Sequence, residues 1–325
     1  MRVVLAINEP PIWTLPTAQV ERITEALPDD DVIDGRDRAA RGAAIVDADV
    51  ILTTLLTGEE FNLTSRLRWI HTTAVGVGGV LSPPAVASDV VVTNSRGVQS
   101  EVIAEHAIAL ALALRRSLHL AVTRQEQCKW AQEEIVDRPA PRLSHSHLLV
   151  VGLGAIGSRV AALASGLGMR VTGVRRRLDQ PVPAGVAEVL PRDRLHEGLA
   201  TADVVVLAVP RTDATRHLIG AAEFEAMKPS AVLVNVARGR LVSEAALVAA
   251  LETGQIGGAG LDVFLHEPLA PDSSLWGVTN LLISPHTAAF DGDFWTPSVD
   301  LFLQNVERFR AGRDLLNVVD KSRGY

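Results

Sequence analysis

The stretch Val150-Val-Gly-Leu-Gly-Ala-Ile-Gly157 decides the predicted fold of this 325-residue chain. It follows the apolar run Leu148–Val151 and opens a segment rich in Ala, Val and Leu, which predicts a strand, a tight turn and a helix. Gly152, Gly154 and Gly157 have the G-x-G-x-x-G spacing. The first glycine allows the bend, the second lets a pyrophosphate approach the backbone, and the third lets helix and strand pack closely. Free N–H groups and the positive dipole at the helix start attract phosphates, so we predict a dinucleotide site here.

Strand and helix patterns continue in both directions from this stretch. Short apolar, β-branched runs alternate with longer helical patterns, which is typical of βαβ units and a parallel sheet with helices on its faces. The predicted strands are Arg2–Ile7, Asp49–Leu52, Trp69–Thr72 and Val90–Thr93, and then Leu148–Val151, Arg170–Val174, Asp203–Ala208, Ala231–Val236, Gly258–Val263 and Leu281–Ser284. Two series of strands predict two α/β units, each with a doubly wound parallel sheet.

One long helix is predicted between the two series, from Glu101 to about Arg124. It carries an unbroken apolar run at Ala107–Leu114, and its length and near-uniform apolarity favour a helix buried between domains over a surface helix.

Composition excludes several classes of protein. Hydrophobic residues make up 47% and charged residues 21% of the chain, which excludes a largely disordered protein. The longest apolar run is too short for a membrane span and the N-terminus has no secretory h-region, so we expect a cytoplasmic protein without a membrane partner. The chain has one cysteine, Cys128, so an internal disulfide is excluded, and no Cys/His cluster has zinc-type spacing, so we expect no metal site. A net charge of −7 without basic blocks argues against nucleic acid as a partner.

The segment after the next strand bears on which dinucleotide is bound. An NAD site has Asp or Glu about 20 residues beyond the glycines, to accept hydrogen bonds from the ribose 2′-OH. This chain has Val171-Thr-Gly-Val-Arg-Arg-Arg177 instead, with Arg175 at that position. Guanidinium groups bind a 2′-phosphate through paired charge-assisted hydrogen bonds. We therefore predict that NADP(H) is favoured through Arg175 and Arg176. A solvated basic turn, with NAD(H) as the cofactor, is the alternative.

Three polar residues follow predicted strands beyond the glycine-rich turn. Arg238 lies in Val234-Asn-Val-Ala-Arg-Gly-Arg-Leu-Val242, Glu267 in Gly260-Leu-Asp-Val-Phe-Leu-His-Glu-Pro268, and His286 in Ile283-Ser-Pro-His-Thr-Ala288. In open α/β sheets the ligand crevice lies outside the carboxyl ends of the strands, so all three are candidate neighbours of the cofactor. Taken singly, each has a structural explanation, as a turn-capping arginine, a solvated charge or a loop histidine.

Together with the glycine-rich turn, these segments resemble the D-isomer-specific 2-hydroxyacid dehydrogenases, which include glyoxylate/hydroxypyruvate reductases and D-lactate and phosphoglycerate dehydrogenases. The likeness covers nearly the whole chain. It includes Asn94-Ser-Arg-Gly97, Ala104-Glu-His-Ala-Ile-Ala-Leu110, Leu233 through Pro268, and a reductase-type tail at Asn317–Tyr325. The resemblance implies a Rossmann domain at 101–289, inserted in a flavodoxin-like substrate domain formed by 1–100 and 290–325. It also implies a homodimer, for which the long helix from Glu101 is a candidate interface.

The resemblance implies a role for each candidate residue. His286 would be the acid/base, because histidine exchanges protons near neutral pH, and Glu267 would hydrogen-bond its other ring nitrogen. Arg238 would bind the substrate carboxylate and polarise the carbonyl of a 2-oxo acid. The backbone N–H groups of Val75 and Gly76 would meet the same carboxylate. The remaining implied cofactor contacts are Ala155, Ile156, Val209, Pro210, Thr215, Val236, Ala237 and Asp262, of which Asp262 has a strand-end cap as its structural alternative.

Two features leave the substrate and even the class of function open. Many relatives carry Asp-Asn or Asp-His where this chain has Gly78-Gly79, so the shape of the carboxylate loop differs. A dehydrogenase of another small anion such as phosphonate has the same triad, whereas a formate enzyme is expected to have glutamine in place of Glu267. A corepressor-like scaffold that binds the dinucleotide and acts through protein partners is the alternative from a different class. The prediction is an oxidoreductase that reduces a small 2-oxo acid to the D-2-hydroxy acid.

Overall fold

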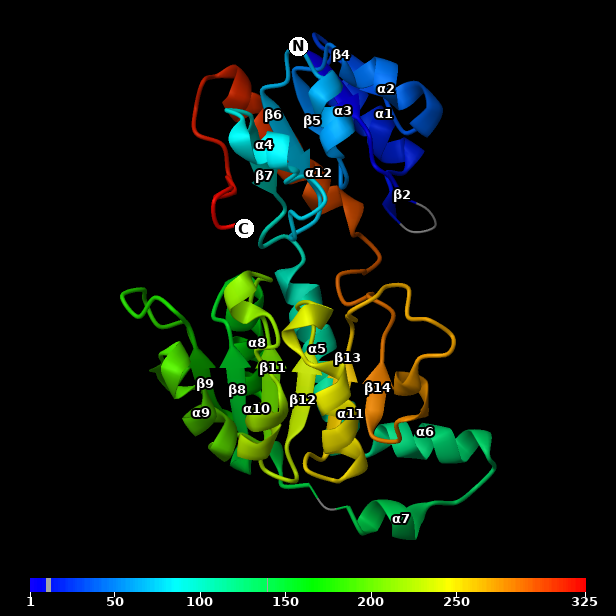
Figure 1. The fold of residues 1–325 in the computed structure, drawn as a ribbon, viewed down its shortest axis with the longest axis vertical. Coiled ribbons are helices and arrows are strands. Elements are labelled where there is room, and N and C mark those ends of the chain that lie inside the picture. Colours follow the sequence, from blue (N-terminus) through cyan, green and yellow to red (C-terminus); the bar gives the residue numbers. More distant parts are fainter. Residues whose placement is uncertain (10–12, 139) are drawn as a thin grey trace. The chain divides into compact units, whose positions relative to one another are not determined.

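The computed structural model describes residues 1–9, 13–138 and 140–325. It divides into two compact units, drawn in Figure 1. Unit 1 comprises Met1–Gln99 and Asp291–Tyr325, and unit 2 comprises Ser100–Phe290. Because unit 1 takes both ends of the chain, unit 2 is an insertion in it.

Unit 1 is built around a five-stranded parallel sheet with the order β4-β1-β5-β6-β7. This is the flavodoxin-like order in which the second strand of the sheet along the chain lies at one edge. The elements are β1 Arg2–Leu5, β2 Asn8–Glu9, β3 Trp13–Thr14, α1 Thr17–Ala26, β4 Asp31–Asp34, α2 Arg38–Ile45, β5 Val50–Leu52, α3 Gly58–Leu63, β6 Trp69–Thr72, α4 Pro83–Ala87, β7 Val91–Asn94 and α12 Trp295–Arg310.

Each face of this sheet packs against its own set of helices. On one face Val3 and Leu5 of β1 pack with Ile23 of α1 and Phe302 of α12. On the other face their neighbour Val4 packs in a second cluster, with Ile45 of α2 among its members. Side chains alternate between the faces of a strand, so covering both faces requires near-continuous apolar strands. α12 therefore joins the C-terminal end of the chain to the N-terminal strands.

Unit 2 contains a seven-stranded parallel sheet with the order β10-β9-β8-β11-β12-β13-β14. Its first six strands along the chain follow the Rossmann order 3-2-1-4-5-6, which confirms the predicted fold class. The elements are α5 Ser100–Arg115, α6 Leu118–Glu126, α7 Gln132–Val136, β8 His147–Val151, α8 Ala155–Gly166, β9 Arg170–Val174, β10 Glu188–Leu190, α9 Leu195–Thr201, β11 Val204–Leu207, α10 Ala221–Ala226, β12 Val232–Asn235, α11 Glu244–Glu252, β13 Gly258–Leu261 and β14 Leu281–Ile283. Short 3-10 turns include η3 Asp213–Thr215 and η4 Gly239–Leu241.

The predicted single helix Glu101–Arg124 is wrong in its extent. α5 ends at Arg115 and α6 begins at Leu118, because Ser117 between them has a left-handed backbone with φ of 54°. α5 is buried, but it packs on α8, β12 and β13 of unit 2. α6 is largely exposed, with Leu120 its only buried residue. The long apolar segment is therefore one core helix followed by one surface helix.

Two strands of the main sheets were not predicted from the sequence. β4, Asp31-Val-Ile-Asp34, and β10, Glu188-Val-Leu190, each lie at an edge of their sheet. Both are short and carry carboxylates, which are depleted in strands. An edge strand has one unpaired side and often carries charged residues, so its sequence gives a weak signal.

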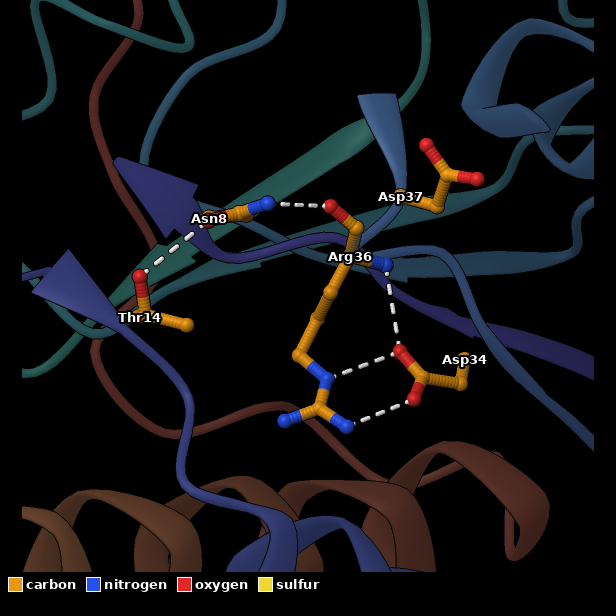
Figure 2. A pocket seen from close by; sticks show the side chains of 5 residues that line it. All are labelled: Asn8, Thr14, Asp34, Arg36 and Asp37. Carbon is orange, nitrogen blue, oxygen red and sulfur yellow. Dashed lines mark hydrogen bonds and ion pairs between the residues drawn. The ribbon is translucent and has the colours of Figure 1, made fainter. Parts of the chain in front are cut away.

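A polar hollow of about 420 Å³ lies in unit 1, and Figure 2 shows the side chains that line it. Arg36 Nε and Nη2 donate to the two carboxylate oxygens of Asp34 at 2.8 and 2.7 Å. These bonds hold the pKa of Asp34 below its usual value. Asn8 donates to the backbone carbonyl of Arg36 and accepts from Thr14, while Asp37 caps α2 through Ala39 N–H. Because these groups satisfy one another, we assign the hollow no ligand.

Among the described residues, no helix is long and apolar enough to cross a membrane. The cytoplasmic location expected from the sequence stays a prediction.

The core of unit 1 contains a histidine that is held neutral. His71 on β6 has no exposed surface, and its Nδ1 lies 2.7 Å from Thr93 Oγ1. Thr93 Oγ1 also accepts the indole N–H of Trp69 at 2.8 Å, so the one hydroxyl links both rings. Burial lowers the pKa of His71 to about 3.

We therefore predict that unit 1 loses stability as pH falls below the ordinary histidine pKa of about 6.5. A depressed folded-state pKa means that the unfolded chain takes up the proton first. At about pH 4.5 the loss from this one group is about 2–3 kcal/mol relative to pH 7.5. Denaturant unfolding of unit 1 measured at both pH values checks this. His71→Asn, which keeps an acceptor for Thr93 but does not titrate, is expected to show a smaller loss by that amount; equal losses in both proteins would contradict the prediction.

Candidate active site

The predicted dinucleotide turn lies where three parallel strands of unit 2 end. The backbone N–H of Gly152 donates to the carbonyl of Val174 at the end of β9, and that of Ala208 donates to Val151 at the end of β8. Gly152 has φ of 103°, and a Cβ at Gly157 would lie 1.8 Å from the carbonyl oxygen of Gly152. A side chain is therefore excluded at both positions. At Gly154 an added Cβ would meet nothing within 4 Å, so the backbone is open to a ligand on that side.

α8 begins at Ala155 directly after this open glycine. The first N–H groups of a helix have no partner within the helix. Those of Ala155, Ile156 and Gly157 are therefore free to donate to a ligand at the start of α8, where the helix dipole is positive. Together with the close glycine packing, this arrangement fits the pyrophosphate of a dinucleotide.

The two candidate arginines lie just beyond β9. The guanidinium of Arg175 donates to backbone carbonyls of its own loop. Its Nη1 lies 2.9 Å from the Pro181 carbonyl oxygen, and its Nη2 donates to the Gln180 carbonyl. Its Nε is buried without a hydrogen-bond partner among the described residues. Arg176 follows it on the exposed surface. The structure thus places both side chains at the end of β9, with Arg175 bound to the loop 180–181.

The other predicted cofactor residues follow β11 and β12. Thr215 in η3 donates its hydroxyl to the carbonyl of Pro210 at 2.8 Å and accepts from Thr212 N–H, which closes the loop after Val209. Ala237 N–H donates to Asn235 Oδ1, and Asn235 Nδ2 donates to the carbonyl of Arg238. Val236 and Ala237 are both buried. Their contacts with a cofactor stay predictions.

The three candidate catalytic residues leave neighbouring strands at the same edge. Arg238 lies three residues after β12, Glu267 lies in the loop after β13, and His286 lies three residues after β14. β12, β13 and β14 are adjacent and parallel, so their carboxyl ends meet at one edge of the sheet. Gly239 lets two of these loops pack closely. Any side chain there would clash, because its Cβ would lie 2.0 Å from the backbone carbon of Phe264.

His286 and Glu267 form a direct pair. His286 Nδ1 lies 2.6 Å from Glu267 Oε2, and Glu267 Oε1 accepts the Phe264 N–H at 2.8 Å. Burial acts to raise the pKa of Glu267, but these hydrogen bonds and the positive charges of His286 and Arg238 outweigh it and lower the pKa. An ionised Glu267 requires a proton on Nδ1 of His286. Nε2 then has no hydrogen-bond partner among the described residues, on an imidazole that is 41% exposed.

Arg238 brings a positive charge close to Glu267. Its Nη1 donates to the carbonyl of Ala237 at 2.6 Å. Burial lowers the pKa of Arg238, Glu267 acts to raise it, and Arg211 acts to lower it. Arginine stays protonated across the accessible pH range, so this partly desolvated guanidinium is suited to bind a carboxylate.

Asp262 is a buried hydrogen-bond acceptor at the end of β13. It directly follows β13 and is only 1% exposed. Its carboxylate accepts hydrogen bonds from the Ser284 hydroxyl and from the N–H groups of Thr287 and Ala288. The strand-end alternative describes these contacts, and a cofactor contact of Asp262 stays a prediction.

The predicted carboxylate loop lies in unit 1. Asn94 Nδ2 donates to the carbonyl of Val75 at 2.7 Å, and Gly79 accepts the N–H of Leu56 with its carbonyl. A Cβ at Gly79 would lie 2.3 Å from the carbonyl oxygen of Thr54. This backbone therefore has no room for the Asn or His side chain that many relatives carry in place of Gly79. The N–H groups of Val75 and Gly76 have no acceptor among the described residues.

Sequence reasoning missed the groups that orient the candidate residues. These are the Phe264 N–H, the Ser284 hydroxyl, and the Asn94 amide. Asn94 and His106 fall in motifs that the sequence singles out, but nothing in the spacing showed their partners. Within the described residues, no group of three or more His, Cys, Asp or Glu is placed to hold a metal ion.

A paired histidine and carboxylate, a half-buried arginine and a glycine-rich turn at one sheet edge fit a dinucleotide-dependent oxidoreductase. Residues 108–288 match the family model described as D-isomer specific 2-hydroxyacid dehydrogenase, NAD binding domain. The chain therefore belongs to the D-isomer specific 2-hydroxyacid dehydrogenase family and is an NAD(P)-dependent oxidoreductase.

Similar proteins agree with this assignment. A glyoxylate reductase of Thermococcus gammatolerans is 35% identical over 85% of this chain and 84% of its own. A glycerate dehydrogenase of Methylorubrum extorquens is 36% identical over 78% and 79%. The crystal structure of an NADPH-dependent glyoxylate/hydroxypyruvate reductase from Sinorhizobium meliloti, in complex with NADP and sulfate, has a TM-score of 0.85 and 25% identity, covering 100% of this chain and 99% of that one.

Proposed function

We propose that the protein reduces a small 2-oxo acid of the glyoxylate or hydroxypyruvate type to the D-2-hydroxy acid. The observation that carries this is the His286–Glu267 pair, which leaves Nε2 of a partly exposed imidazole without a partner among the described residues, at the same sheet edge as Arg238. The named activities of the Thermococcus, Methylorubrum and Sinorhizobium proteins support this substrate class.

The chain's own residues perform the following steps. Reduced nicotinamide, when bound, supplies the hydride for the carbonyl carbon. Arg238 binds the substrate carboxylate through paired N–H groups and orients the carbonyl. His286 donates the proton on Nε2 to the carbonyl oxygen, while Glu267 accepts a hydrogen bond from Nδ1 and stabilises the charged ring. The carboxylate contact expected of Val75 and Gly76 in unit 1 stays a prediction.

His286→Ala is expected to lower kcat by about 10²–10⁴, the usual contribution of a general acid. NADPH affinity is expected to stay within about twofold, because the glycine-rich turn is untouched. Initial rates with glyoxylate and fluorescence titration with NADPH check this. His266→Ala, in the exposed loop beside Glu267, is the matched control and should keep the wild-type rate. A His286→Ala protein with more than about a tenth of wild-type kcat would contradict the assigned role.

We propose that NADP(H) is the preferred cofactor. Two observations support this: arginines stand at the end of β9 where an NAD site has an acid, and the Sinorhizobium reductase is NADPH-dependent. NAD(H) binding is compatible with the same glycine-rich turn.

Replacing Arg175 and Arg176 together with Ala is expected to lower kcat/KM for NADPH by about 10–100-fold, as losing charge-assisted hydrogen bonds does. The value for NADH should change less than about threefold. Arg177→Ala, the next exposed arginine, serves as the control. Wild-type protein that uses NADH better than NADPH would overturn the proposed preference.

We propose a homodimer that uses the exposed surface of the segment 118–136, with Leu118 and Val122 on α6, Trp130 in the connection and Val136 on α7. All four apolar side chains are exposed, and Trp130 is 89% exposed. Figure 1 shows α7 at the outer edge of unit 2. Large exposed apolar surfaces mark interaction sites, and isologous dimers are the commonest oligomers.

Val122→Asp combined with Trp130→Ser is expected to convert a dimer to a monomer at micromolar concentration in light scattering. Trp276→Ser removes another exposed tryptophan outside this surface and should leave the dimer intact. A wild-type protein with monomer mass would disprove the proposal.

A further inference from the structure

A buried hydrogen-bond network holds the loop that carries His286. Asp262 Oδ1 lies 2.7 Å from Ser284 Oγ and 2.9 Å from Thr287 N, and Asp262 Oδ2 lies 3.0 Å from Ala288 N. The carboxylate therefore bonds to the chain on both sides of His286. With 1% exposure, it has little competition from water, so each of these bonds holds the loop firmly.

His106 on α5 forms the outer end of this network. Its Nε2 lies 2.8 Å from Ser284 Oγ and 3.6 Å from Asp262 Oδ1. The Ser284 hydroxyl has one proton, and it donates that proton to the acceptor-only carboxylate of Asp262. Ser284 Oγ must therefore accept from His106, which fixes a proton on Nε2 of His106.

The loop needs this support because His286 has an unfavourable backbone. Its φ is 55°, in the left-handed region. A non-glycine residue adopts that conformation at a cost in free energy, and only where the surroundings determine it. The backbone direction at His286 also decides whether its Nδ1 reaches Glu267.

We propose that His106 is a positioning residue for the reaction, acting through Ser284 and Asp262 to fix the backbone that directs His286 toward Glu267. Among the described residues His106 hydrogen-bonds neither Glu267 nor His286, and its effect passes through the Ser284 hydroxyl. The inference rests on the proposed function, because it assigns His286 the proton transfer.

Four variants test the network. His106→Leu and Ser284→Ala each remove the same link, so each is expected to lower kcat about tenfold, and the double variant should lose no more than either one. His106→Gln places an amide N–H near the position of Nε2 and should restore kcat to within about threefold of wild type. NADPH affinity and the thermal midpoint should stay near wild-type values in all of them.

His119→Leu is the matched control, because His119 is another half-buried histidine of unit 2 that bonds the Ala113 carbonyl instead of this loop. It should keep the wild-type kcat. Additive losses in the double variant, or a His106→Gln protein as impaired as His106→Leu, would overturn the proposal. A thermal midpoint that falls in step with kcat would also overturn the proposal, because it would mean that the variant loses activity through lost stability.

A second readout separates this inference from the proposed function. The proton shared by His286 Nδ1 and Glu267 should give a low-field proton resonance in the NADPH-bound protein, assigned by its loss in Glu267→Gln. The signal should weaken in His106→Leu and return in His106→Gln. If wild-type protein turns over no oxo acid, the proposed function fails, while this signal still decides the positioning role. A signal unchanged in His106→Leu would overturn it.

Discussion

The parallel pairing of the seven strands in unit 2 is the constraint on which the site depends. Parallel register brings the carboxyl ends of β8 through β14 to one edge, so residues up to about 130 positions apart in the chain meet there. The phosphate-binding turn follows β8, and the polar residues follow β12, β13 and β14. Such an edge is where ligands bind in open α/β sheets, because the loops there are free to vary while the strands stay buried.

Close backbone packing then sets the geometry of the loops. Gly157 lets α8 begin directly against β8, and Gly239 lets the Arg238 loop press on Phe264. Phe264 in turn donates to Glu267, and Glu267 accepts from His286. A chain of contacts therefore runs from the end of β12 to the imidazole. Each member is fixed by a partner from another strand end, which is how a preorganised site keeps its donors aimed.

The fold, and the position of the three candidate catalytic residues at one sheet edge, could be predicted because both depend on strong local signals. The glycine spacing, the apolar runs and three short motifs are all readable from consecutive residues. The break at Ser117 was missed because apolar periodicity continues across it, and β4 and β10 were missed because edge strands carry Asp and Glu. The partners of Asp262 and His106 were not predictable, since a hydrogen bond between α5, β13 and β14 is a property of three-dimensional placement. Arg175 shows the same limit, because its guanidinium turns onto its own loop.

The stereochemistry of the product tests the central claim most directly. Hydroxypyruvate is incubated with NADPH and the wild-type protein, and the glycerate formed is resolved into its enantiomers and compared with the NADPH consumed. Membership of the D-isomer specific family, together with the proposed reduction of a 2-oxo acid, predicts D-glycerate in a one-to-one ratio with the NADPH consumed. L-glycerate, or tight NADPH binding without consumption of either reactant, would contradict it. The second result would indicate that this edge is retained in a dinucleotide-binding scaffold.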